Sequence, residues 1–168
     1  MITKDMLLIW LKEIDKKLEK KITVIAVGGT AMTLLSLKSS TIDIDFCLKQ
    51  DDKKCFEKAM TKQFRVDLFT DGYIFSEQLP EDYTEIAKEI IKLENITLKA
   101  LHPMDIVITK AARFNARDEE DIAAVAKYVN KDELVTRFKE VVKTYAGKEE
   151  DYNENFLFIL KKYFSSRK

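Results

Sequence analysis

Two aspartates, Asp43 and Asp45, are separated by one residue in a segment where apolar and polar side chains alternate. This segment, residues 41–48, reads Thr-Ile-Asp-Ile-Asp-Phe-Cys-Leu and predicts a β-strand. Side chains two residues apart on a strand leave the same face, so the two carboxylates would lie side by side and the alternate residues, Ile42 among them, would face a core. Neighbouring carboxylates repel each other, and a hard divalent cation such as Mg²⁺ or Mn²⁺ removes that repulsion.

The segment before this strand adds a place where an anion can bind. A β-branched run over residues 22–27 predicts a buried strand, Gly28 and Gly29 end it, and residues 30–38 return to a helical pattern. Glycines at such a turn let backbone N–H groups approach a phosphate. A plain strand-to-helix turn is the alternative interpretation of the two glycines.

A third acid, Asp67, lies in the middle of another predicted strand, residues 64–69, where an unpaired carboxylate is costly. Three acids on two adjacent strands, facing a glycine turn, form the layout of a metal-assisted phosphoryl-transfer site. Acid-x-acid pairs are common in this chain, because it has 29 acidic residues among 168 and about five such pairs are expected by chance. A solvated strand face that carries surface acids is therefore the alternative.

These segments together resemble the nucleotidyltransferase fold of the polymerase-β type. The resemblance is carried by Gly-Gly-Thr-Ala-Met (28–32), Thr-Ile-Asp-Ile-Asp-Phe (41–46) and Arg-Val-Asp-Leu-Phe (65–69). It covers about residues 22–128 and is greatest to small prokaryotic branches, the AbiEii-like proteins and the minimal nucleotidyltransferases of toxin–antitoxin systems. Those branches also carry a helical block similar to residues 108–122, with a lysine, an arginine and two spaced acids.

The resemblance implies that the protein transfers an NMP group from an NTP to a hydroxyl, with Mg²⁺ or Mn²⁺ as cofactor. The triphosphate would be held by Gly28, Gly29 and Thr30. The metal ligands would be Asp43, Asp45 and Asp67, and the last of these would also assist the attacking hydroxyl. The helical block would contribute Lys110, which approaches the phosphates, and the acids Asp118 and Asp121, which orient Lys110 or the substrate.

Two positions differ from the family's pattern. Gly29 stands where many members have serine, so Thr30 would have to supply the phosphate-binding hydroxyl. Ser39 stands where an arginine is common, with Lys38 one position away. Lys110 has a second interpretation as well, because a lysine on a helix face can simply pair with a neighbouring acid such as Asp118.

The elements that must position these residues follow one another as helix, strand, helix, strand, helix, strand, hairpin and then helices. This order predicts an α/β or α+β fold, with a small mixed sheet flanked by helices and a helical C-terminal half. The hairpin is expected at 89–100, whereas residues 73–85 are expected to be irregular. We expect one nucleotidyltransferase-like domain over 1–130 and a helical extension over 131–168 that packs on it.

Composition excludes several other classes. Lysine plus arginine and aspartate plus glutamate both number 29, so the net charge is zero and a polybasic nucleic-acid or membrane binder is not expected. His102 is the only histidine and precedes a proline at a predicted helix start, so a capping position is favoured over a zinc site or a histidine-based catalytic group. No Rossmann or P-loop motif is present. Two cysteines outside a CxxC pair, and no apolar run of membrane-spanning length, predict a cytoplasmic protein.

The acceptor is left open by the sequence, since an RNA end and a hydroxyl on a partner protein both suit the chemistry. The alternative function is a catalytically inactive nucleotidyltransferase fold that serves as a binding or antitoxin-like module. The C-terminal helix is rich in aromatic residues, which indicates either core packing or an interface with a partner protein. These residues are Phe156, Phe158, Ile159, Tyr163 and Phe164.

Overall fold

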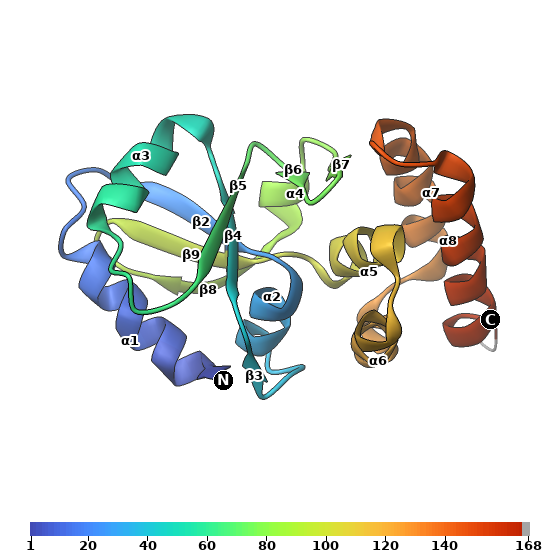
Figure 1. The fold of residues 1–168 in the computed structure, drawn as a ribbon, viewed down its shortest axis with the longest axis horizontal. Helices are drawn as coiled ribbons and strands as arrows, with labels where there is room; N and C mark the ends of the chain where they lie inside the picture. The colour runs from blue at the N-terminus through green and yellow to red at the C-terminus, as the bar shows by residue number, and fades with distance from the viewer. Residues whose placement is uncertain (166–168) are drawn as a thin grey trace.

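A seven-stranded mixed sheet forms the first half of the chain and helices form the second in the computed structural model, which describes residues 1–165 (Figure 1). The strands of this sheet are β2 (Ile22–Ala26), β4 (Ile44–Leu48), β5 (Val66–Thr70), β6 (Tyr73–Ile74), β7 (Glu77–Gln78), β8 (Lys88–Lys92) and β9 (Ile96–Ala100). The helices are α1 (Lys4–Asp15), α2 (Gly28–Leu34), α3 (Gln50–Ala59), α4 (Tyr83–Ile86), α5 (Pro103–Arg113), α6 (Ala116–Val125), α7 (Lys131–Val141) and α8 (Glu149–Tyr163). The predicted fold class is confirmed.

The strand order is β7-β6-β5-β4-β2-β9-β8, so the most apolar strands occupy the centre. β2 pairs in parallel with β9 and antiparallel with β4, and β4 pairs in parallel with β5. Val24 and Phe46, on β2 and β4, are completely buried. The predicted hairpin is confirmed as β8 and β9, with a bulge between Glu89 and Ile91.

The predicted continuous strand over 41–48 is wrong in its first part. Residues 40–41 form a separate short strand, β3 (Ser40–Thr41), which pairs with β1 (Ile2–Thr3), and β4 begins only at Ile44. Because the chain bends at residues 42–43, the alternation of faces does not extend back to Ile42, which is 60% exposed instead of facing the core. Asp43 therefore lies in the bend that leads into β4.

The region predicted to be irregular, residues 73–85, contains the hairpin of β6 and β7 followed by α4. Sequence periodicity missed the hairpin because each strand has only two residues. A tight turn at Asp71 and Gly72 starts it, with φ of 52° and 80°. A side chain at position 72 would meet the Tyr83 ring at 2.8 Å, so glycine is needed there for space as well as for backbone conformation.

The helical half is held together by buried polar contacts as well as by apolar packing. His102 is the N-cap of α5 and its Nδ1 accepts a hydrogen bond from the Met104 N–H, which confirms the predicted capping position. Arg137 on α7 forms a buried ion pair with Asp105 on α5, and the Tyr152 hydroxyl on α8 donates to the Ile108 carbonyl at 2.7 Å. Four helices, α5 to α8, thus pack as one group (Figure 1).

The aromatic residues at the C-terminus belong mainly to this packing. Phe156, Ile159 and Phe164 are buried, Tyr163 packs against the core, and Phe158 is 46% exposed. The domain boundary after residue 130 and the partner-protein surface on these helices stay predictions. Within residues 1–165, no helix is long and apolar enough to cross a membrane.

Candidate functional site

The acids predicted to form the site come from two neighbouring parallel strands. Asp45 on β4 and Asp67 on β5 are direct partners in the strand register, so their side chains leave the sheet on the same face at adjacent positions. Asp43 precedes Asp45 by two residues, in the bend. Asp67 also forms an ion pair with Arg65 at 3.6 Å, and its side chain is 46% exposed. The in-register pairing of Asp45 and Asp67 brings two of the three acids to one place.

Thr30 fixes the segment that carries these acids. Its hydroxyl donates to the Asp43 carbonyl at 3.2 Å and accepts from the Asp45 N–H at 3.0 Å. The side chain is completely buried, and both of its hydrogen-bonding functions are used within the protein. Thr30 thus joins α2 to the start of β4 and positions the two aspartates, and its contact with a phosphate stays a prediction.

The carboxylate of Asp45 is electrostatically destabilised. Its pKa is raised to about 6, first by burial and then by the negative charges of Asp67 and Asp43, although Arg113 and Lys110 lower it. No hydrogen bond or ion pair within residues 1–165 reaches the side chain of Asp43 or Asp45. Asp45 is thus a half-buried acid whose negative charge the nearby cations compensate only in part.

The two glycines of the predicted turn form the first residues of α2, and they lie directly beside the acids. Gly28 adopts a φ of 53°, and a Cβ on it would be 3.4 Å from Oδ2 of Asp45 and 3.6 Å from the Phe75 ring. A Cβ on Gly29 would be 3.0 Å from the Thr41 hydroxyl oxygen. Gly28 is therefore favoured by its positive φ, whereas a Cβ on Gly29 would crowd the Thr41 side chain. Of the two, Gly29 lines the cleft described below.

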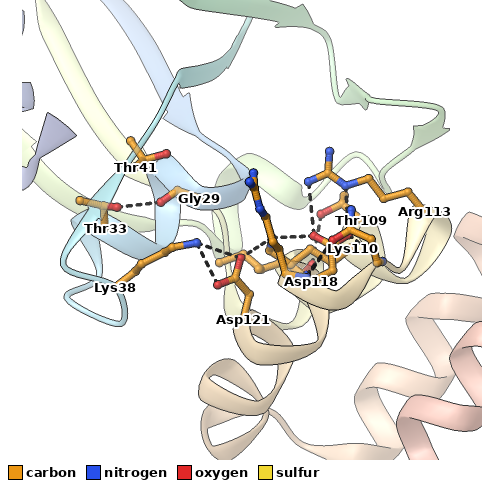
Figure 2. Close-up of polar contacts among 12 residues, drawn as sticks. Gly29, Thr33, Lys38, Thr41, Thr109, Lys110, Arg113, Asp118 and Asp121 are labelled. Carbon is orange, nitrogen blue, oxygen red and sulfur yellow. Dashed lines mark hydrogen bonds and ion pairs between the residues drawn. The ribbon is translucent and has the colours of Figure 1, made fainter. Parts of the chain in front are cut away.

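Across from the acids, a chain of alternating charges runs over α5 and α6 (Figure 2). Lys110 Nζ donates to Asp121 at 2.7 Å and to Asp118 at 3.1 Å, and its side chain is only 3% exposed. Arg113 also pairs with Asp118, at 3.2 Å, and Lys38 reaches Asp121 at 3.1 Å from the other half of the protein. The predicted association of Lys110 with Asp118 and Asp121 is present in the structure.

Asp118 is the central anion of this network. Burial alone would raise its pKa, but Lys110, the Asn115 N–H and Arg113 outweigh burial and lower the pKa below its usual value. Asp118 also completes a capping box with Asn115 at the start of α6. The acids of the helical side are therefore compensated inside the protein, in contrast to Asp45.

A cleft of about 690 Å³ separates the two sets of charged residues. Among the described residues that line it, five are acidic and four are basic: Asp43, Asp45, Asp118, Glu120 and Asp121, and Lys38, Lys110, Arg113 and Arg117. Sequence reasoning missed Arg117 and did not place Lys38 in the site. Their signal was available, because Arg117 lies inside the helical block 108–122 and Lys38 is next to Ser39.

Comparison with known proteins agrees with this geometry. Over residues 5–168, the chain matches a family described as nucleotidyltransferase of unknown function (DUF6036). The chain belongs to this family. No curated protein and no solved structure matches it.

Membership of this nucleotidyltransferase family confirms the coarser part of the resemblance drawn from the sequence, whereas the AbiEii-like branch stays a prediction. The family supports a nucleotide substrate and an activity of transferase type. It specifies neither the nucleotide nor the acceptor.

The described residues do not form a complete set of metal ligands on their own. Within residues 1–165, no group of three or more His, Cys, Asp or Glu side chains is assembled that could hold a metal by itself. The acids of β4 and β5 offer the type of oxygen ligand that Mg²⁺ prefers, and Mg²⁺ commonly uses one or two carboxylates together with substrate phosphates. The carboxylates of Asp45 and Asp67, which are partners in the strand register, fit that second kind of site, and Asp43 lies two residues before Asp45.

Proposed function

We propose that the protein transfers an NMP group from an NTP to a hydroxyl, with Mg²⁺ or Mn²⁺ bound by Asp43, Asp45 and Asp67 together with the phosphates. The observation that carries this proposal is the pairing of Asp45 with Asp67 in the strand register, next to Gly28. Membership of a nucleotidyltransferase family supports the same reaction class.

The metal requirement is supported by the charges of the cleft. Asp45 has a raised pKa, and no hydrogen-bond donor within residues 1–165 reaches its side chain. Acidic side chains also outnumber basic ones among the described residues that line the cleft. A triphosphate is strongly negative and would be repelled by Asp43 and Asp45. A divalent ion, when bound, supplies the positive charge that lets the carboxylates and the phosphates share one place.

In the proposed reaction, the acceptor hydroxyl oxygen forms a bond to the α-phosphorus, and the bond from that phosphorus to the oxygen bridging to the β-phosphate breaks, so that pyrophosphate leaves. The hydroxyl proton passes to a carboxylate, and we assign Asp67 to this step because its side chain is 46% exposed and can be reached by an acceptor. The backbone at Gly28 and Gly29 holds the phosphates, and Thr30 keeps Asp45 in place.

The cations of the helical side divide the work by their accessibility. Lys110 is 3% exposed and holds two carboxylates, so we assign it a fixed positive charge that acts on the phosphates from behind Asp118 and Asp121. Arg113 is 51% exposed and Lys38 is 37% exposed, so these two side chains are available to contact phosphate oxygens directly. This refines the expectation that Lys110 itself approaches the phosphates.

The acceptor would be an RNA end or a hydroxyl on a partner protein, in a toxin–antitoxin context. Incubation with α-labelled NTP and Mg²⁺, with RNA and cell protein offered together, separates the two acceptors by the fraction that becomes labelled. Labelled pyrophosphate from γ-labelled NTP would accompany either product.

Calorimetric titration with NTP in the presence of Mg²⁺ tests the site itself. We expect binding by the wild type, loss of binding in EDTA, and loss in Asp45→Asn and in the Asp43→Ala/Asp45→Ala double variant. Asp151→Asn, which removes an exposed acid at the start of α8, is the matched control and should bind normally. If the wild type binds no NTP under any metal condition, the proposed nucleotidyl transfer is excluded. The alternative, a catalytically inactive binding module, then replaces it.

A further inference from the structure

Phe75 occupies the tip of the β6–β7 hairpin in a backbone conformation that aromatic residues rarely adopt. Its φ is 57°, in the left-handed region that normally favours glycine. Such a conformation persists only where the surrounding structure holds it, and strained residues of this kind gather at functional sites. The contacts of the Phe75 ring must therefore offset the cost of this backbone conformation.

The Phe75 ring contacts three features of the candidate site or of its support. It lies 3.6 Å from where a Cβ on Gly28 would be, beside Asp45. The Arg113 guanidinium stands over the ring, 4.9 Å from its centroid. From behind, Phe69 packs edge-on with a centroid distance of 4.9 Å. One ring thus joins the glycine turn of the sheet side to the arginine of the helical side.

The hairpin that carries Phe75 is anchored to both halves of the protein. β6 pairs with β5 through Thr70 and Tyr73. On the other side, the Ala146 N–H donates to the Ser76 carbonyl at 3.0 Å, and the Gln78 N–H donates to the Thr144 hydroxyl at 2.8 Å. In Figure 1 the hairpin lies between the sheet and the helices. The tip is therefore fixed in place from both sides.

Arg113 needs such a fixed support. Its side chain is half-exposed, and a guanidinium on a long flexible stem otherwise samples many rotamers. Asp118 accepts hydrogen bonds from Nε and one terminal nitrogen of Arg113, and the guanidinium carbon stands over the Phe75 ring. A cation–π contact uses no N–H donor, so the N–H groups of Arg113 that Asp118 does not bind stay available for an anion.

We propose that Phe75 is a positioning residue that holds Arg113 toward the phosphates of the nucleotide. This inference rests on the proposed function, because it gives Arg113 a phosphate as its ligand. Phe75 itself touches neither the substrate nor the reacting atoms. Its strained backbone is maintained because the ring links the glycine turn to Arg113.

The first measurement needs no nucleotide. In the metal-free protein, the NMR signal of the Arg113 Nε–H should show a ring-current shift and slow exchange with water. Phe75→Leu keeps apolar volume and removes the aromatic face, so the shift should disappear and exchange should accelerate. Phe75→Tyr should retain both properties. Phe69→Leu, which removes the supporting ring without contacting Arg113, should leave the signal in slow exchange.

The second measurement is a double-mutant cycle on the affinity for NTP with Mg²⁺. Phe75→Leu should weaken binding about fivefold in the wild type, which is the size of one cation–π contact. In an Arg113→Ala background it should have almost no further effect. An unchanged Arg113 signal in Phe75→Leu, or additive losses of affinity in the cycle, would overturn the proposal.

The two proposals fail in different ways. If the wild type binds no NTP, the proposed function fails, and the NMR comparison alone decides whether Phe75 holds Arg113. If the wild type binds NTP and Phe75→Leu binds it equally well, the proposed function stands and the positioning by Phe75 is refuted. Thermal unfolding of each variant shows whether it is folded during these measurements.

Discussion

The acids of the sheet side and the acids of the helical side have opposite environments, although they face each other across one cleft. Asp118 and Asp121 are enclosed by Lys110, Arg113 and Lys38, and the pKa of Asp118 is lowered. Asp45 has no such partner within residues 1–165, and its pKa is raised to about 6. The protein therefore compensates the acids of α6 with its own cations, whereas it leaves Asp45 on β4 to a ligand that carries positive charge.

The largest loss of stability is expected when the cation that compensates Asp118 and Asp121 is removed. Lys110→Met removes the buried cation and leaves Asp118 and Asp121 facing each other with less compensation. Removing one partner of a buried ion pair typically costs about 3–5 kcal/mol of the free energy of unfolding. Urea unfolding should show this loss, and Lys139→Met, an exposed lysine on α7, should show almost none.

A buried acid outside the cleft allows a pH test of the same contrast. Glu77 on β7 is completely buried, and its Oε1 has no hydrogen-bond partner within residues 1–165. Burial raises its pKa to about 8, while the Ser76 N–H and Arg113 oppose that rise. The unfolded chain releases this proton near pH 4.5, so the contribution of Glu77 to stability is complete below that pH and is lost as pH rises through about 8.

Glu77→Gln should remove this pH dependence. Relative to the variant, the wild type should lose roughly 2–4 kcal/mol of unfolding free energy between pH 4.5 and pH 9. The control is Glu89→Gln, which changes an exposed acid on β8. Parallel stability–pH curves for wild type and Glu77→Gln would show that Glu77 ionises normally in the folded protein.

Asp45→Asn tests whether the charge of Asp45 destabilises the metal-free protein. Without metal, the substitution relieves burial of a charge and repulsion from Asp67 and Asp43, so the variant should be about 1 kcal/mol more stable at pH 7. With Mg²⁺ and NTP, the wild type should gain stability by ligand binding and the variant should not. Thermal unfolding in EDTA and in Mg²⁺ with NTP gives both values. A loss of stability in EDTA would mean that Asp45 already has a compensating partner.

The smallest effect on stability is expected for Lys38→Ala. Its ion pair with Asp121 is partly exposed, and such pairs contribute about 0.5 kcal/mol or less. The same variant should bind NTP more weakly, because it removes a cation that is available to the phosphates. Equal affinity in the two proteins would place Lys38 outside the nucleotide site.

Sequence pattern predicted the parts of the site that depend on local periodicity and spacing. Asp45 and Asp67 each lie inside a strand whose apolar residues define it, so their places on adjacent strands could be inferred. The same reasoning failed at Ile42, because a bend of two residues interrupts the alternation. The two-residue strands β6 and β7 carry no periodic signal at all.

Tertiary contacts decided the rest. The hydrogen bonds of the Thr30 hydroxyl to the backbone of Asp43 and Asp45 depend on the packing of α2 against β4, which the sequence pattern does not give. The depth of Lys110 between two acids depends on how α6 packs against α5. The placement of Phe75 under Arg113 requires a positive φ at a residue that does not favour it.

In the proposed site, a divalent ion binds together with the nucleotide at the acids of β4 and β5. Paramagnetic broadening by Mn²⁺, added with a non-hydrolysable NTP to isotope-labelled protein, tests this most directly. We expect the signals of Gly28, Asp45 and Asp67 to broaden first, and Asp45→Asn to abolish the effect. Broadening that begins instead at the acids that line a pocket with Arg137, such as Glu81, Asp132 and Glu133, would show that the ion binds elsewhere than at β4 and β5.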